Sequence, residues 1–189
     1  KRVVFEIQEE LPNIKNFGTL SPIPGFRNWY INLDEKLVKN ILGNIPLENI
    51  SFLKSSSLKI GDTRILSNKN AIYKLVTHYL MNEKNQKQLP INDVCRFHLG
   101  NGATIDDIVI NANISEVGFN RSFGVMVNYL YELKNIEKNH EEYINNKTII
   151  VSNKVKKTNS INSIRSPLYF IPNSFVKIIE QKRNDRANT

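Results

Sequence analysis

The chain has few residues of the kinds that build covalent cross-links or metal centres. Its 189 residues include one cysteine, three histidines, one tryptophan and two methionines. A single cysteine, Cys95, excludes an internal disulfide and fits a reducing compartment. The three histidines are scattered and do not stand at metal-ligand spacing, so we expect no metal site.

Long apolar runs are missing, and an excess of charge is confined to one end. No segment approaches the roughly 20 apolar residues that a membrane helix needs, so we expect no membrane partner. Residues 1–133 carry 15 basic and 13 acidic side chains, whereas residues 134–189 carry 11 and 5. Because this basic end lacks interleaved aromatic residues, it is typical of a solvated segment, and we expect no nucleic-acid partner.

The length predicts one main domain, which we place at residues 1–151. The first residues, KRVVFEIQEE, contain neither an initiator methionine nor the features of a signal peptide, so we expect the chain to begin inside a longer protein. After residue 151 the hydrophobic periodicity fades. We therefore predict a basic, flexible tail at residues 152–189.

Helical periodicity dominates the first half of the chain. Apolar residues at i, i+3 and i+4 predict a helix over Arg2–Glu10 and another that closes at Gly43. A longer apolar stripe at residues 72, 75, 76, 79 and 80 predicts a well-buried helix, and His78 falls off this stripe and is expected to face solvent. Between these helices, Leu58–Asn68 is predicted to be a polar connector.

Strand patterns appear at both ends of the predicted domain. We expect a short strand over Phe17–Leu20 and another over Ala103–Ile110. Phe123–Leu133 is rich in β-branched and aromatic residues, which predicts a central strand buried on both faces. Lys134–Asn146 is predicted to be a polar helix or loop, and Ile149–Val151 a last short strand.

Two polar residues are ambiguous when each is considered alone. Ser21 precedes a proline, which is typical of a turn or helix-cap serine. His98 lies on a short helix that we expect Asp93 to cap and Gly100 or Gly102 to end. A buried histidine of this kind is usually a core residue, and neither residue by itself indicates catalysis.

Three segments together resemble the malonyl-CoA decarboxylase family. They are LSPIPGF at Leu20–Phe26, FHLGNGA at Phe97–Ala103 and GVMVNYLYEL at Gly124–Leu133. The resemblance extends to RVVFEIQEELPNIKNFGTLSPIPGF, KLVTHYLMNEK and IEKNHEEY, and it covers residues 1 to about 151. It does not reach the expected tail.

The resemblance implies an α/β catalytic domain with the fold of the GCN5-related acetyltransferases (GNAT), a mixed sheet flanked by helices. It implies that this fold is incomplete at the N-terminus, because the loop that cradles the coenzyme A pyrophosphate would precede Lys1. It also implies that Ser21 and His98 are the catalytic pair and that malonyl-CoA is the substrate. No cofactor is expected beyond the coenzyme A that the substrate carries, and the full-length protein is expected to be a homo-oligomer.

The chemistry accounts for these residue types. Loss of CO2 from malonyl-CoA leaves an enolate, which needs hydrogen-bond donors at its oxygen and a proton at its carbon. A histidine that titrates near neutrality can supply the proton as donor, and a serine hydroxyl can hold the departing carboxylate or accept and relay a proton. Asn101 and Tyr131 are further candidates for substrate-binding or orienting roles.

Other functions remain open at this level. The same fold could serve a GNAT-type acyltransferase, although the TLSPIPGF segment argues against it, or a non-catalytic remnant that binds coenzyme A. The physiological role would lie in fatty-acid or malonate metabolism. We expect a cytoplasmic location, with the mitochondrial matrix as the alternative.

Overall fold

The computed structural model describes residues 2–14 and 16–160, and the expected tail beyond residue 160 lies outside these ranges. The elements are, in chain order, α1 (Arg2–Glu10), β1 (Asn16–Pro22), α2 (Phe26–Ile31), α3 (Glu35–Leu42), α4 (Glu48–Ser51), the 3-10 turn η1 (Phe52–Lys54), α5 (Thr63–Ser67), α6 (Lys69–Met81), α7 (Asp93–Gly100), β2 (Thr104–Val109), α8 (Glu116–Ser122), β3 (Met126–Glu132), α9 (Ile136–Asn146) and α10 (Asn153–Ser160).

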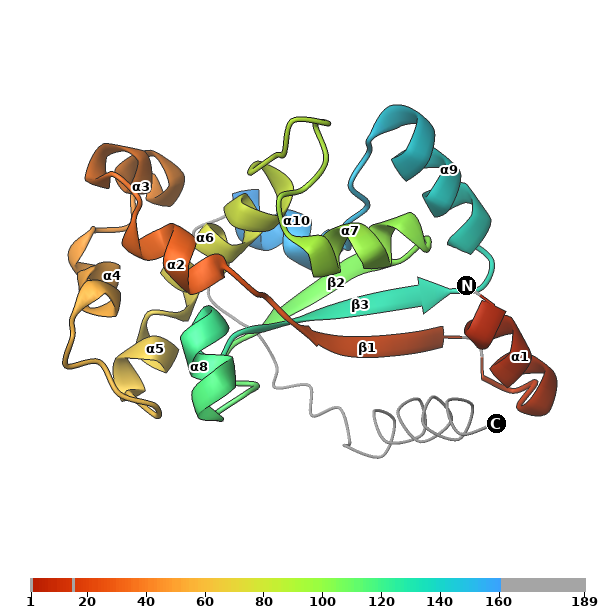
Figure 1. The fold of residues 1–189 in the computed structure, drawn as a ribbon, viewed down its shortest axis with the longest axis horizontal. Helices are drawn as coiled ribbons and strands as arrows, with labels where there is room; N and C mark the ends of the chain where they lie inside the picture. The colour runs from red at the N-terminus through yellow and green to blue at the C-terminus, as the bar shows by residue number, and fades with distance from the viewer. Residues whose placement is uncertain (1, 15, 161–189) are drawn as a thin grey trace.

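The described strands form one small antiparallel sheet with the order β1-β3-β2. The strands predicted over Phe17–Leu20, Ala103–Ile110 and Phe123–Leu133 are present as β1, β2 and β3, and β3 is central as predicted. The register pairs Asn16 with Glu132 at one end of β1 and Pro22 with Met126 at the other. Helices flank this sheet (Figure 1), so the α/β class predicted from the sequence is confirmed.

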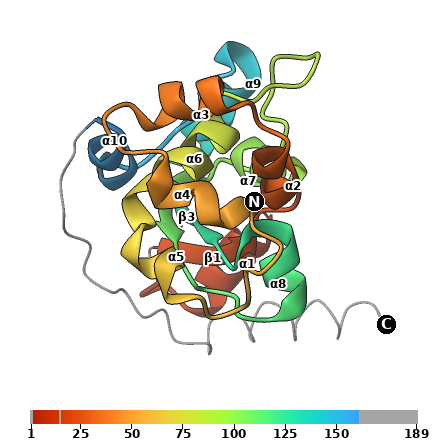
Figure 2. The ribbon, with the colours of Figure 1, turned by 90° about the vertical axis from the view of Figure 1, so that its left-hand side faces the viewer.

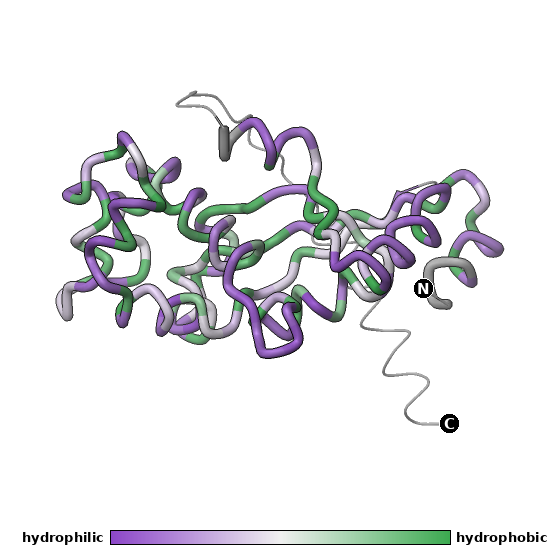
Figure 3. Tube along the Cα trace, turned by 90° about the horizontal axis from the view of Figure 1, so that it is seen from above, coloured by the Kyte–Doolittle hydropathy of each residue, from purple (hydrophilic) through white to green (hydrophobic). Residues whose placement is uncertain are grey.

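Helices α6, α7 and α10 all contact β2 and lie on the same side of the sheet (Figures 1 and 2). The apolar stripe of α6 is buried as predicted, since Ile72, Leu75 and Val76 have no exposed surface. Hydrophobic residues follow the strands through the middle of the molecule, and hydrophilic ones dominate its outer turns (Figure 3). Burial of these apolar faces stabilises the fold by roughly 25 cal/mol for each Å² removed from water.

The prediction that β3 is buried on both faces is wrong. Val127, Tyr129 and Tyr131 are buried, whereas Met126 and Leu130, which point the other way, are only half-buried. Side chains alternate along a strand, so Val127, Tyr129 and Tyr131 point to one face of the sheet and Met126 and Leu130 to the other, less buried face. The segment also begins later than predicted, because Phe123 ends α8 with φ 54°.

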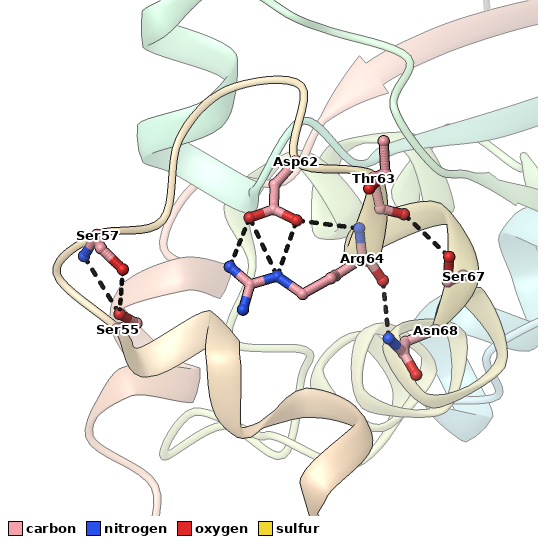
Figure 4. Close-up of polar contacts among 7 residues, drawn as sticks. All are labelled: Ser55, Ser57, Asp62, Thr63, Arg64, Ser67 and Asn68. Atoms are coloured by element: carbon pink, nitrogen blue, oxygen red, sulfur yellow. Dashed lines mark hydrogen bonds and ion pairs between the residues drawn. The ribbon is translucent and has the colours of Figure 1, made fainter.

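The segment between Ser55 and Asn68 is more regular than the predicted connector. Asp62 caps α5 by accepting from the backbone of Arg64, and it also forms an ion pair with the Arg64 side chain at 2.6 Å (Figure 4). These local contacts explain the helix that the sequence pattern missed. The predicted helix end at Gly43 is confirmed, with φ 62° at that glycine.

The last part of the described chain also differs from prediction. Residues Ile149–Val151 make only an isolated parallel bridge, between Val151 and Ile105. Residues 153–160, at the start of the predicted tail, form the helix α10, which packs on β2 and α6 and buries Val155. Lys134–Asn146 contains the helix α9. Among the described helices, none has both the length and the hydropathy that crossing a membrane requires.

Candidate active site

Ser21 lies near the end of β1, on the face that α7 covers. It is paired with Val127 of β3, and only 7% of its surface is exposed. The strand ends at Pro22, because proline has no N–H to continue the ladder. The serine hydroxyl is therefore held at the point where the sheet gives way to a turn.

The turn that follows Ser21 is fixed by its backbone and by two side chains. Gly25 has φ 83°, and a Cβ at this position would lie 2.9 Å from the Tyr79 hydroxyl, so only glycine fits. The carbonyl of Pro24 accepts hydrogen bonds from the Tyr79 hydroxyl at 3.1 Å and the Asn92 amide at 2.9 Å. The rigid turn expected from the two prolines thus has tertiary support.

Helix α7 places His98 against the sheet. Its N-cap is Asn92, whose side-chain oxygen accepts from the backbone N–H of Cys95 at 2.8 Å, so the predicted cap at Asp93 is wrong by one residue. The helix ends at Gly100, as predicted. His98 lies on its buried face with 7% exposed, whereas Phe97 is 64% exposed.

The side chains of Ser21, His98 and Tyr131 form a continuous hydrogen-bonded chain. Ser21 Oγ lies 2.9 Å from His98 Nε2, and His98 Nδ1 lies 2.7 Å from the Tyr131 hydroxyl. All three side chains are buried. Two residues 77 positions apart in the sequence are therefore in direct contact, with a tyrosine on the far side of the ring.

Two neighbours of this chain were not predicted as site residues. Thr19 Oγ1 lies 3.3 Å from Ser21 Oγ, and the Tyr129 ring stacks on the His98 ring with centroids 4.2 Å apart. Both lie two positions before a predicted site residue on a strand. The period of two places such residues on one face of the sheet, which is the signal that could have found them.

Asn101 does not join the group. It follows the last residue of α7, and its amide donates to the backbone carbonyl of Phe97 at 2.7 Å. This contact closes the end of the helix, whereas no described contact links the amide to Ser21 or His98. The structure therefore gives Asn101 a local structural contact and gives Tyr131 a direct contact with the histidine.

Burial sets the protonation state of His98. Desolvation lowers the pKa of the ring from its usual 6.5 to about 4, so the ring is neutral at physiological pH. The expectation of a histidine titrating near neutrality is therefore wrong for this environment. Burial also raises the pKa of the Tyr131 hydroxyl, which keeps its proton.

The shift of His98 predicts a pH dependence of stability. Between pH 6.5 and about 4 the unfolded chain binds a proton that folded His98 does not, so the free energy of unfolding decreases as the pH falls through this window. The decrease reaches about 3 kcal/mol, because one pKa unit corresponds to about 1.4 kcal/mol. Urea unfolding at several pH values should show this decrease in the wild type and a smaller one in His98→Gln. The same dependence of the free energy of unfolding on pH in both proteins would contradict this prediction.

The described residues hold no cluster of metal ligands, and the thiol of Cys95 is not poised for reaction. In residues 2–14 and 16–160, no three histidine, cysteine or acidic side chains gather at ligand distance. Cys95 is fully buried, and burial raises the pKa of its thiol to about 11, which leaves it protonated and unreactive. The groups that the structure brings together here are the two hydroxyls of Ser21 and Tyr131 and the imidazole of His98.

Comparisons with known proteins agree with the segments that the sequence singled out. Residues 1–168 match the model of the malonyl-CoA decarboxylase C-terminal domain. The match extends past residue 151, so the expectation that the resemblance ends there is wrong. Over 174 residues the chain is 33% identical to the mitochondrial malonyl-CoA decarboxylase of Anser anser anser. The matched region covers 82% of this chain and 34% of that protein.

Solved structures give the same result. The chain is similar to the malonyl-CoA decarboxylase of Rhodopseudomonas palustris, with a TM-score of 0.70 and 33% identity over 83% of this chain and 36% of that one. For the enzyme of Cupriavidus metallidurans the TM-score is 0.68 and the identity 31%, over 83% and 42%. The chain spans about a third of the length of the curated relatives it matches. It belongs to the malonyl-CoA decarboxylase family and corresponds to the C-terminal domain of that family.

Proposed function

We propose that this chain carries the catalytic site of a malonyl-CoA decarboxylase, which converts malonyl-CoA to acetyl-CoA and CO2. The observation that supports the proposal is the buried contact between Ser21 and His98, with Tyr131 behind the ring. Each member comes from a segment that resembles the family. Because the chain spans about a third of the length of its relatives, the activity of the whole protein is stated as a proposal.

The reaction needs a place for negative charge and a source of one proton. When the C–C bond to the carboxylate breaks, its electron pair forms an enolate of the thioester. A positioned acid that protonates such a carbon contributes about 10²–10⁴-fold in rate. The neutral ring of His98 has one N–H, so its position decides what the histidine can do.

The contacts of Tyr131 indicate where this N–H lies. The buried phenol keeps its proton, and His98 Nδ1, at 2.7 Å, is the acceptor that the described residues place beside it. A buried donor without an acceptor costs about 1–3 kcal/mol, which favours donation from Tyr131 to Nδ1. The ring then carries its own proton on Nε2 and donates it to Ser21 Oγ at 2.9 Å.

This arrangement gives each side chain a role. The Nε2 proton of His98 is delivered to C2 of the enolate, while the Tyr131 proton moves toward Nδ1 and keeps the ring neutral. The network regains one proton from water, which balances the proton consumed in each turnover. Ser21 accepts from Nε2, so its own hydrogen is free to bind the malonyl carboxylate and to return to Thr19 Oγ1, 3.3 Å away, when the site is empty.

The wider expectations remain part of this proposal. The small antiparallel sheet is compatible with one arm of a GNAT-type sheet, and the division into residues 1–151 and 152–189 stays a prediction. No cofactor is proposed beyond the coenzyme A of the substrate. A homo-oligomer, a role in fatty-acid or malonate metabolism and a cytoplasmic location are proposed for the intact protein. The relatives from Anser anser anser and Mus musculus are named mitochondrial enzymes, which supports the matrix as the alternative.

The test is release of labelled CO2 from carboxyl-labelled malonyl-CoA by the intact protein. Ser21→Ala removes the hydroxyl aimed at the carboxylate, and we expect kcat to fall about 10²–10³-fold, as for the loss of one preorganised donor. Ser67→Ala, at an exposed position of α5, is the matched control and should retain wild-type kcat. A folded wild type that binds coenzyme A and releases no CO2 would overturn the proposal in favour of a non-catalytic remnant.

A further inference from the structure

The turn after α7 holds the end of the helix that carries His98. The backbone N–H of Asn101 donates to the carbonyl of Phe97 at 3.2 Å, and that of Gly102 donates to Leu99 at 2.9 Å. The N–H of Ala103 donates at 3.1 Å to the carbonyl of His98 itself. These bonds satisfy carbonyls that a helix end leaves free, so the turn and the histidine backbone move together.

Two adjacent side chains of α9 bind this turn. Asn139 donates its amide to the carbonyl of Gly102 and to the hydroxyl of Thr104, both at 3.2 Å. His140 Nδ1 lies 2.6 Å from the carbonyl of Gly100. A carbonyl only accepts, so His140 carries a proton on Nδ1 and donates it there.

The contact of Asn139 is transmitted to His98 by a single peptide group. The carbonyl of Gly102 and the N–H of Ala103 belong to the same planar amide. The side chain of Asn139 donates to the oxygen of this amide, and the N–H of the same amide, on Ala103, donates to the carbonyl of His98. Bonds in such a chain polarise and strengthen one another in a buried setting, and Asn139 is only 8% exposed.

The packing brings the backbone of the turn directly against α9. A Cβ on Gly102 would lie 2.2 Å from the carbonyl oxygen of Ile136, at the start of α9. The backbone of the turn and the first turn of α9 are therefore in direct contact, and the two polar side chains fix their relative position.

We propose that Asn139 and His140 are positioning residues that hold His98 in place through the Gly100–Thr104 turn. The inference rests on the proposed function of His98, since it concerns the placement of that ring. A displacement of about 1 Å in a reacting group can cost about 10²-fold in rate. Loss of these contacts should thus lower kcat and leave KM nearly unchanged.

Two pairs of variants of the intact protein test the proposal. Asn139→Asp keeps the shape of the side chain and removes both donated bonds, and Asn145→Asp makes the same change on the exposed side of α9. His140→Leu removes the donor, whereas His140→Asn can place an amide N–H close to the former Nδ1. We expect Asn139→Asp to lower kcat about 10–10²-fold with KM nearly unchanged, Asn145→Asp to resemble the wild type, and His140→Asn to recover most of what His140→Leu loses.

A second measurement does not depend on activity. The ring ¹⁵N resonances of His98 report its hydrogen bonds to Ser21 and Tyr131, and they should shift in Asn139→Asp and His140→Leu but not in the two matched variants. If Asn139→Asp and His140→Leu lower the melting temperature while kcat and the His98 resonances keep wild-type values, α9 only stabilises the fold and the proposal is overturned. If Asn139→Asp does not fold, the two His140 variants decide. An inactive wild type would overturn the proposed function, while the resonances would still test the positioning.

Discussion

Replacing His98 by glutamine is expected to lower kcat about 10²–10⁴-fold, the range that a positioned proton donor contributes. Glutamine has nearly the same length, and its amide can still donate toward Ser21. It cannot pass a proton to the substrate and regain one from Tyr131, so the loss isolates proton transfer from hydrogen bonding. The measurement is steady-state release of CO2 from malonyl-CoA, with circular dichroism to verify the fold.

The matched control is His78→Gln on α6. His78 was expected to face solvent, but it is half-buried. Its ring stacks on that of Trp29, with centroids 6.1 Å apart, and its Nε2 lies 3.4 Å from the carboxylate of Glu83. It has no described contact with Ser21 or His98, and its replacement should leave kcat at the wild-type level. If His98→Gln keeps a rate within about twofold of wild type, the ring is not the acid, because such a loss is far below that range.

Replacing Gly102 by alanine is expected to destabilise the protein by about 3–5 kcal/mol, which is near the top of the range for single substitutions. The new Cβ would lie 2.2 Å from a backbone oxygen of Ile136, and neither group belongs to a flexible side chain. The residue also has φ 82°, which costs an alanine about 1–2 kcal/mol. The measurement is urea unfolding of the intact protein.

Gly61→Ala provides the control for backbone strain alone. Gly61 has φ 81°, nearly the same as Gly102, but a Cβ there would meet no atom within 4 Å. We expect a loss of only about 1–2 kcal/mol from this variant. Equal losses in the two variants would mean that the close approach between the turn and α9 contributes nothing.

The core of the fold could be predicted because it depends on local periodicity. The stripe of α6 and the central β3 each appear as a regular pattern of apolar residues, and both are present. The predicted helix over residues 2–10 is also present, with the predicted bounds. Among the elements that were missed, α5 and α10 have weak apolar patterns. Their helices depend on a polar cap at Asp62 and on packing against α6 and the sheet, which periodicity does not report.

The candidate site was only half visible in the sequence. Ser21 and His98 were named through the resemblance, and Tyr131 was one of two candidates for an orienting role. The structure separates the two, since Tyr131 contacts the ring of His98 while Asn101 binds its own helix. Thr19 and Tyr129 escaped notice because neither residue type signals catalysis by itself.

The sequence by itself determined which residue types and segments this protein has, and with them its family, its sheet-forming strands and the identity of Ser21 and His98. Tertiary structure alone decided that these two side chains meet and that a tyrosine lies behind the ring. It also decided that the histidine is neutral, because its pKa depends on burial by residues far apart in the chain. Local sequence sets backbone preferences, whereas distance and desolvation arise only when distant segments pack together.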